Sequence, residues 1–190
     1  PQLYKPSPNL KIDLILEEAV LDLPMREADV AIRMKEPSQA DLIRKKLMSV
    51  RMCLYASPTY IATHGAPVSL DDMENHRFIS QNVTAAQVSA GALMIKEIMT
   101  HNVGSSLTIN NYFGVLQGVL HDLGIGLLPD YLTDDFPDLV RVLPDVESNE
   151  IPVFLAYPEE LRHSKRIENF RDFVTEEIIA HRRRRRDAQG

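Results

Sequence analysis

The residues best suited to bind a ligand follow three short apolar runs, and most of them are polar. They are, in chain order, Arg33 and Met34 in "AIRMK", Ser80, Gln81 and Asn82 in "ISQN", and Asn110, Asn111, Tyr112 and Phe113 in "TINNYF". In an open α/β sheet, ligands bind beyond the carboxyl ends of the strands. Main-chain amides at a helix start favour an anion there. These nine residues are therefore candidate contacts for a small molecule, and Arg33 and the helix start near Asn111 would suit a carboxylate. In the alternative interpretation, Asn110 and Asn111 are only helix caps and Arg33 forms a structural ion pair.

Residues that could catalyse a reaction or hold a metal are scattered along the chain. The six histidines form no His-x3-His pair on a helix, and the chain has a single cysteine, so we predict no metal site and no cofactor. His121 and Asp122 are adjacent, so their side chains would diverge by about 100° on a helix. Asp71 and Asp72 fall in the first turn of a predicted helix, where carboxylates interact with the helix dipole. Cys53 lies in an apolar run and is predicted to be a buried, unreactive thiol.

Two glycines in "HDLGIGLLPDYL" suggest a phosphate-binding loop, but their order along the chain argues against one. A phosphate loop runs strand, glycines, helix, so that the helix start faces the phosphate. Here a helical pattern precedes the glycines and a strand pattern follows them. We therefore expect Gly124 to take the left-handed turn that ends the helix after Leu123, and Gly126 to allow close packing of the returning strand.

The hydrophobic pattern predicts the elements that would hold these residues. Strands are predicted over 9–18, 28–34, 43–57, 77–81, 105–109, 125–129, 138–144 and 151–158. Helices are predicted over 20–27, 58–64, 69–76, 112–123 and 164–181, with Ser57, Ser69, Asn110 or Asn111, and Ser164 as caps. Residues 85–98 fit either a helix or a strand. The first elements suggest a mostly parallel sheet, with the strand at 9–18 buried on both sides.

Composition is that of an ordinary globular domain, with 44% apolar and 25% charged residues, a net charge of −6 and no apolar run long enough to span a membrane. The run Arg182–Arg186 holds five of the 21 basic residues, and the rest of the chain has 16 basic against 27 acidic residues. The body is therefore no obvious nucleic-acid surface. The arginine run could touch nucleic acid or an acidic partner, but we favour a solvated helix end and a disordered tail over 182–190. The lone cysteine and the absence of a signal peptide pattern fit a cytoplasmic protein.

Five segments in this order resemble the effector-binding domain of LysR-type transcriptional regulators, from about residue 9 to 178. They are "EADVAIRM", "LYASPTYIATHGAPVSLDDMENHRFI", "GVLHDLGIGLLPDYL", "LVRVLPD" and "IPVFLAYPEELRHSKRIENFRDFV". The resemblance implies two Rossmann-like α/β lobes of the type 2 periplasmic-binding-protein kind, joined by crossover strands near Ala56 and Val146. Lobe one would comprise 1–56 and 147–181, without its first strand, and lobe two 57–146.

The resemblance also implies a small-molecule effector between the lobes, a homodimer or homotetramer, and DNA binding only through an N-terminal winged helix-turn-helix that this chain lacks. A solute-binding protein for transport on the same fold is the alternative, and it would carry a signal or lipid-attachment sequence upstream. An enzyme on this scaffold is not expected, because the nine candidate residues include no Asp, Glu, His or Cys.

Overall fold

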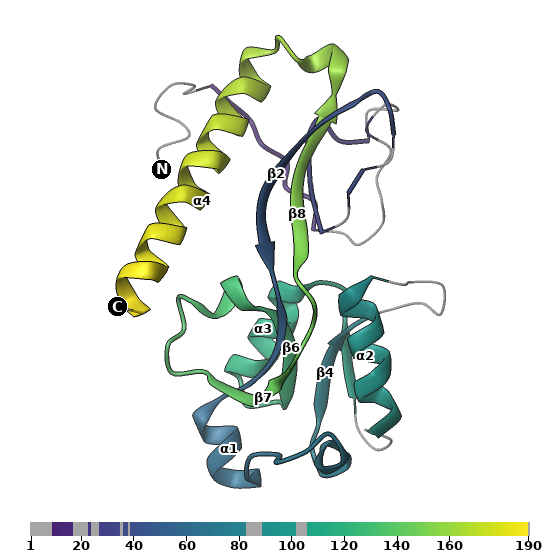
Figure 1. The fold of residues 1–190 in the computed structure, drawn as a ribbon, viewed down its shortest axis with the longest axis vertical. Coiled ribbons are helices and arrows are strands. Elements are labelled where there is room, and N and C mark those ends of the chain that lie inside the picture. The colour runs from purple at the N-terminus through teal and green to yellow at the C-terminus, as the bar shows by residue number, and fades with distance from the viewer. Residues whose placement is uncertain are drawn as a thin grey trace. The chain divides into compact units, whose positions relative to one another are not determined.

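The computed structural model describes residues 9–16, 23, 27–34, 36–37, 39–82, 89–101 and 106–189. The chain divides into two compact units, here called unit 1 (Pro1–Ser49 and Pro152–Gly190) and unit 2 (Val50–Ile151). The chain therefore passes between the units twice, near residues 50 and 151 (Figure 1). The lobe boundaries predicted from the sequence, 56/57 and 146/147, lie several residues inside unit 2.

In the residues that the structure describes, unit 1 is a three-stranded sheet with one long helix. The strands are β1 (Ala31–Arg33), β2 (Leu42–Val50) and β8 (Ile151–Pro158), in the order β1-β8-β2. β1 runs antiparallel to β8, with Ala31 opposite Ala156. After the short 3-10 helix η4 (Glu159–Leu161), helix α4 (Lys165–Gln189) follows. Its apolar stripe packs on the sheet, where the buried side chains of Leu47, Leu155, Tyr157 and Ile167 form a core.

The predicted strand over 9–18 is wrong for the part that the structure describes. Residues 10–16 adopt no regular structure, and Leu14 is 76% exposed. Alternating apolar residues show only that a strand could bury one face, whereas a strand also needs a neighbour for its main-chain hydrogen bonds. Among the described residues, these seven have no such neighbour. The predicted helix over 20–27 falls mostly outside the described residues.

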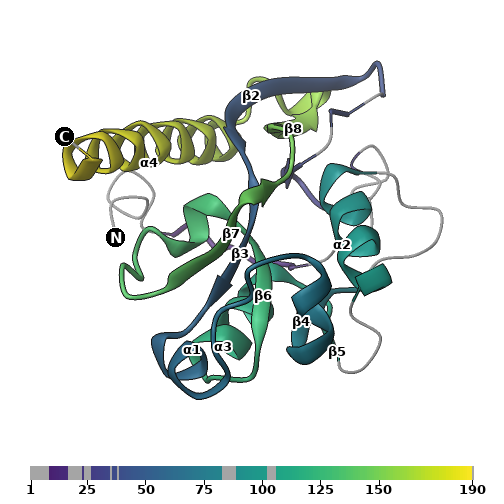
Figure 2. The ribbon, with the colours of Figure 1, turned by 60° about the horizontal axis from the view of Figure 1, so that its bottom comes forward.

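Unit 2 holds a five-stranded mixed sheet. Its strands are β3 (Met52–Ala56), β4 (Phe78–Gln81), β5 (Ser106–Ile109), β6 (Ile125–Pro129) and β7 (Val140–Glu147), in the order β5-β4-β6-β3-β7 (Figure 2). β4 is parallel to β5 and β6, whereas β3 is antiparallel to β6 and β7. The mostly parallel sheet expected from the first elements, residues 9–57, is not confirmed by the pairs described for them, since β1 is antiparallel to β8 and β3 is antiparallel to β6 and β7. β3 and β7 are antiparallel neighbours because the chain enters unit 2 through β3 and leaves it after β7.

Helices α1 (Pro58–His64), α2 (Ala90–His101) and α3 (Tyr112–Leu120), with the 3-10 helices η2 (Asp71–Asn75) and η3 (Asp130–Thr133), complete unit 2. α1 begins and ends as predicted, since the Ser57 hydroxyl accepts the Tyr60 N–H at 3.0 Å and Gly65 has φ 78°. The predicted helix over 69–76 is only η2. The ambiguous segment 85–98 contributes the first nine residues of α2, the helical alternative.

The end of α3 differs from the prediction at Gly124. The helix stops at Leu120, and Asp122, with φ 60°, takes the left-handed turn. Leu123 N–H then bonds to Gly118 O at 3.0 Å and Asp122 N–H to Val119 O at 3.1 Å, which is the hydrogen-bond pattern of a Schellman motif. Asp tolerates this conformation because its short polar side chain can hydrogen-bond locally. Gly124 serves a different purpose, because a Cβ there would lie 2.4 Å from Arg77 O.

Gly126 behaves as predicted, since a Cβ on it would lie 2.4 Å from Val119 Cγ2 of α3. The C-terminal helix, in contrast, does not end near His181. α4 continues through Arg182–Arg186 to Gln189. Arginine, alanine and glutamine are good helix formers, no proline or glycine interrupts the run, and positive charge is favourable at a helix C-terminus.

Candidate functional site

The polar ends of β4 and β5 lie side by side in unit 2. The two strands are parallel, with Ser80 opposite Thr108 and Gln81 opposite Ile109. Directly beyond the sheet, Asn82 N–H donates to Ile109 O at 3.0 Å. Seven of the nine predicted residues, 80–82 and 110–113, are therefore brought to one edge of this sheet, which we call the carboxyl edge.

Gln81 is the distinctive residue of the carboxyl edge. Both Ser80 and Gln81 are 2% exposed, and the Gln81 Nε2 amide has no hydrogen-bond partner among the residues that the structure describes. An unpaired buried polar group costs about 1–3 kcal/mol, so such groups are rare in native proteins. This amide is therefore a donor that a bound ligand could satisfy.

Helix α3 starts at the carboxyl edge. Asn111 is its N-cap, with Oδ1 accepting the Gly114 N–H at 2.8 Å and Nδ2 donating to Asn110 Oδ1 at 2.9 Å. Asn111 thus has the capping role considered from the sequence, while Asn110 is exposed. The α3 start also carries the positive end of the helix dipole, which favours an anion. Phe113, in the same turn, is 57% exposed.

Helix α2 starts beside α3, which sequence reasoning did not foresee. Ser89 caps α2, accepting the Ala92 N–H at 3.2 Å. A Cβ on Gly91 would lie 3.3 Å from the Tyr112 hydroxyl and 3.5 Å from Met52 Cγ, so the first turns of both helices meet there. The available signal was Ser89 directly before an apolar run, but that run also fits a strand.

The other two predicted residues belong to unit 1. Arg33 is the last residue of β1 and Met34 follows it, and both are half-buried. Arg33 has an interaction partner of its own. Their part in a site with the carboxyl edge stays a prediction.

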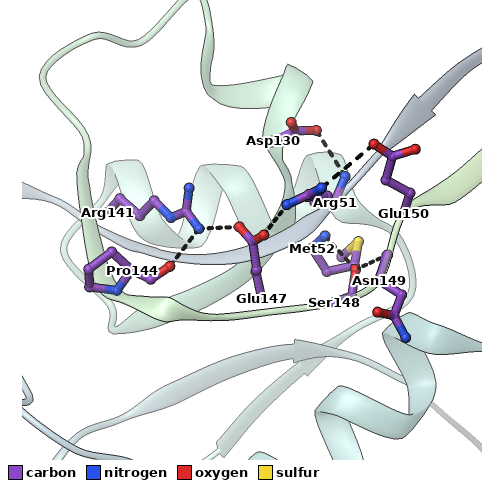
Figure 3. Close-up of polar contacts among 9 residues, drawn as sticks. All are labelled: Arg51, Met52, Asp130, Arg141, Pro144, Glu147, Ser148, Asn149 and Glu150. Atoms are coloured by element: carbon purple, nitrogen blue, oxygen red, sulfur yellow. Dashed lines mark hydrogen bonds and ion pairs between the residues drawn. The ribbon is translucent and has the colours of Figure 1, made fainter.

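An ion-pair network holds the two chain crossings together on the side of unit 2 (Figure 3). Glu147 of β7 bonds to Arg51 Nη1 and, at 2.5 Å, to Arg141 Nη2. Arg51, the residue before β3, also lies 3.6 Å from Glu150 and binds Asp130 through its main chain, with N–H to Oδ1 at 3.1 Å. Hydrogen bonds from Arg141 and Arg51 lower the pKa of the Glu147 carboxyl.

Next to this network, Met52 and Ser148 are bonded twice. Met52 N–H donates to Ser148 Oγ at 2.9 Å, and Ser148 N–H donates to Met52 O at 3.0 Å. Because Met52 also packs near Gly91, the two Met52–Ser148 hydrogen bonds connect the chain crossing to the start of α2. No sequence signal indicated them, since their partners are about a hundred residues apart.

Other reactive groups are arranged for structure. Cys53 is buried as predicted, and burial raises the pKa of its thiol. The Ser57 hydroxyl donates to Asp122 Oδ1 at 2.5 Å, and His121 has no part in this contact. No group of three or more metal-ligating side chains occurs in the part of the chain that the structure describes. Within the same residues, no helix is long and apolar enough to cross a membrane.

Curated relatives of this chain are HTH-type transcriptional regulators that are longer than it. CrgA, an HTH-type transcriptional regulator of Neisseria meningitidis serogroup C, is 25% identical over 175 residues, which cover 90% of this chain and 58% of the relative. The probable HTH-type transcriptional regulator LtrA of Klebsiella pneumoniae is 26% identical over 179 residues, or 91% and 58%. The chain thus spans less than two thirds of these relatives.

Solved structures agree on the fold. The regulatory domain of CrgA, a LysR-type transcriptional regulator from Neisseria meningitidis, gives a TM-score of 0.76 at 22% identity, covering 93% of this chain and 88% of that one. The regulatory domain of AphB from Vibrio vulnificus gives 0.65 at 24% identity, covering 91% and 87%. The predicted α/β fold of the type 2 periplasmic-binding-protein kind is confirmed. The family model of the LysR substrate binding domain matches residues 1–178, and the chain belongs to this family.

Proposed function

We propose that this chain is the effector-sensing part of a LysR-type transcriptional regulator, and that it binds a small carboxylate at the carboxyl edge of unit 2. The observation that supports this most strongly is the unpaired Gln81 amide at the carboxyl edge, where α3 starts and where the first turn of α2 meets that of α3. An amide donor and two positive helix ends suit a small anion. Arg33 and Met34 of unit 1 would complete the site on the other side of the ligand.

The ligand would act by preferring one arrangement of the two units over another. Its effect is limited to its difference in affinity for the two arrangements. A shift from 1:99 to 99:1 needs a preference of about 5.5 kcal/mol. In the longer protein this shift would alter transcription through a homodimer or homotetramer that binds DNA through an upstream winged helix-turn-helix.

The ligand class can be tested by thermal shift and calorimetry with a library of small carboxylates, each paired with its uncharged amide. Asn111→Asp keeps the helix cap, because Asp caps as well as Asn. It adds a negative charge at the edge, and we expect at least about a tenfold loss of carboxylate affinity with little loss of stability. Asn75→Asp, an exposed position of η2, is the matched control and should bind normally.

Gln81→Leu removes the amide donor at nearly constant side-chain volume. It should weaken binding of the same ligand without adding a negative charge that repels it. If carboxylates bind wild type, Asn111→Asp and Gln81→Leu equally well, the carboxyl edge is not the site. If only the uncharged amides bind, the carboxylate assignment is wrong while the site stands.

The regulatory role is tested by the gene sequence upstream of this chain. We expect it to encode a winged helix-turn-helix, and a signal or lipid-attachment sequence there would favour a transport protein instead. In the whole protein, a ligand identified by the thermal-shift screen should change the affinity for DNA or the length of DNA that the protein protects.

A further inference from the structure

The two units differ in charge. Unit 2 holds 4 Lys and Arg against 12 Asp and Glu, a formal charge of −8. Unit 1 holds 17 against 15, a formal charge of +2, and five of its basic residues are Arg182–Arg186. The end of α4 is thus a concentrated positive charge on an otherwise acidic chain.

The side chains at this end of α4 are presented to solvent. Arg182, Arg183 and Arg184 are exposed, and none of them pairs with a carboxylate among the described residues. One turn earlier, Ile179 is 46% exposed. Since residues three and four apart share a helix face, Ile179 lies beside Arg182 and Arg183. The face combines an uncovered apolar side chain with two guanidinium groups.

Unit 2 has a pocket of complementary character, with a volume of about 290 Å³. It lies between the start of α1, the end of α3 and the loop after η3, and its lining includes Asp122, Asp135 and Asp138. Asp135 and Asp138 are exposed and form no ion pair with another described residue. We call this the acidic pocket.

The walls of the acidic pocket suit an arginine stem as well as its charge. Leu120, Phe136 and Leu139 line it and are packed against the core of unit 2. Arginine buries its methylene stem on apolar surface while its head group binds carboxylates, often in a bidentate manner. Of the lining residues, Asp122 accepts a hydrogen bond at its main-chain O from Arg77 Nη2 at 3.3 Å.

We propose that the arginine end of α4 docks in the acidic pocket of a second copy of this chain. Arg182 and Arg183 bind Asp135 and Asp138, and Ile179 covers the apolar wall. The observation that favours this occupant is the charge complementarity of the two surfaces. A nucleic acid would also attract the arginines, but the rest of the chain carries a net negative charge that would repel its phosphates.

A charge swap in the full 190-residue chain tests the contact, with the dissociation constant of self-association measured by sedimentation at low salt. We expect Arg182→Glu with Arg183→Glu, and separately Asp135→Lys with Asp138→Lys, each to weaken association at least about tenfold. The four changes combined should restore association to within about threefold of wild type, because the pairs are re-formed with reversed sign. Circular dichroism and melting temperature report whether each variant folds.

Glu74→Lys with Asp145→Lys is the matched control. It makes the same charge change on exposed positions of unit 2 outside the pocket, and should leave association unchanged or slightly stronger. For any variant that fails to fold, Arg182→Gln with Arg183→Gln and Asp135→Asn with Asp138→Asn remove the charges more mildly.

Four results would overturn the proposal. The first two are a wild-type chain that stays monomeric at high concentration and charge reversals that leave the dissociation constant unchanged. The third is a combined variant that associates no better than either charge-reversed pair. The fourth is energetic coupling between the two pairs in a monomeric chain, which would put the contact within one chain. Arginine variants that lose only binding to duplex DNA would assign this surface to nucleic acid instead.

Discussion

The central strands of unit 2 and the edge strand β2 of unit 1 are buried to different extents. In unit 2, all five residues of β3 and all five of β6 are buried, so these central strands are covered on both faces. In unit 1, the central strand β8 is buried at seven of its eight positions, but the edge strand β2 buries Leu42, Leu47 and Val50 and exposes Arg44, Lys45 and Lys46. Strands covered on both faces are continuous apolar runs, and strands covered on one face are not. The difference implies that packing changes cost more in β6 of unit 2 than in β2 of unit 1.

The largest effect should come from a cavity at the centre of unit 2. Leu127 of β6 is fully buried, and we expect Leu127→Ala to lower the free energy of unfolding by about 3–5 kcal/mol. Leu47→Ala in β2, where the side chain is 9% exposed, should cost about 2 kcal/mol. Hydrogen exchange followed by mass spectrometry can report the loss for each unit separately. Equal losses would contradict the comparison.

A smaller effect is expected where a glycine allows two segments to touch. Gly124→Ala should cost about 2–3 kcal/mol, because the new methyl group would meet the rigid main chain at Arg77. Gly65→Ala is the control within unit 2, since no atom lies near its Cβ position and only its positive φ is unfavourable, at about 1–2 kcal/mol. Urea unfolding of both variants measures the difference, and a Gly65→Ala cost as large as that of Gly124→Ala would argue against the clash.

Acid should weaken unit 2 through a buried histidine. His76 Nδ1 lies 3.3 Å from the Tyr60 hydroxyl, and the His64 ring stacks on Tyr60 with 4.4 Å between centroids. Burial lowers the pKa of His76, the charge of His64 lowers it further, and Asp72 opposes them. Since the unfolded chain then binds the proton more readily, this stability is full above the unfolded pKa of about 6.5 and declines as the pH falls below it.

His76→Gln should therefore flatten the decline of melting temperature between about pH 7 and pH 5. His163→Gln, at an exposed position of unit 1, is the control and should leave the decline as it is. An identical pH profile for wild type and His76→Gln would mean that another group is responsible.

The smallest effect should come from the network at the chain crossings. Arg141 and Arg51 lower the pKa of Glu147, so the stability that this carboxylate contributes is present above its usual pKa and is lost as the pH falls through the lowered one. Glu147→Gln should slightly lower the melting temperature at neutral pH, and about 0.5 M salt should reduce the difference because these charges are solvent-exposed. Glu168→Gln, which removes the Lys165 partner in unit 1, should have less effect still.

Local signals predicted much of unit 2, because caps and turns depend on neighbours in sequence. Ser57, Pro58 and Gly65 fixed α1, and Asn111 fixed the start of α3. The residues at the carboxyl edge were also predictable, since strand ends and helix starts follow from periodicity. What they do there stays a prediction.

The remaining features depend on contacts distant in sequence. Gly124 faces the main chain of Arg77, and Glu147 binds Arg51, which no local pattern reveals. The unpaired Gln81 amide is visible only once its surroundings are built. Residues 10–16 show the reverse case, in which a good strand pattern lacks a partner among the described residues.

The strand order β1-β8-β2 has a consequence for synthesis of the chain. β8 lies between two strands that precede it by about a hundred residues, so the sheet of unit 1 cannot form until Pro158 has left the ribosome. Unit 2, being continuous from Val50 to Ile151, can fold first. At about 5–20 residues per second, β1 and β2 wait roughly 5–20 s without their shared neighbour. During that interval the folded unit 2 keeps the end of β2 close to the start of β8, which lowers the entropy cost of pairing these strands.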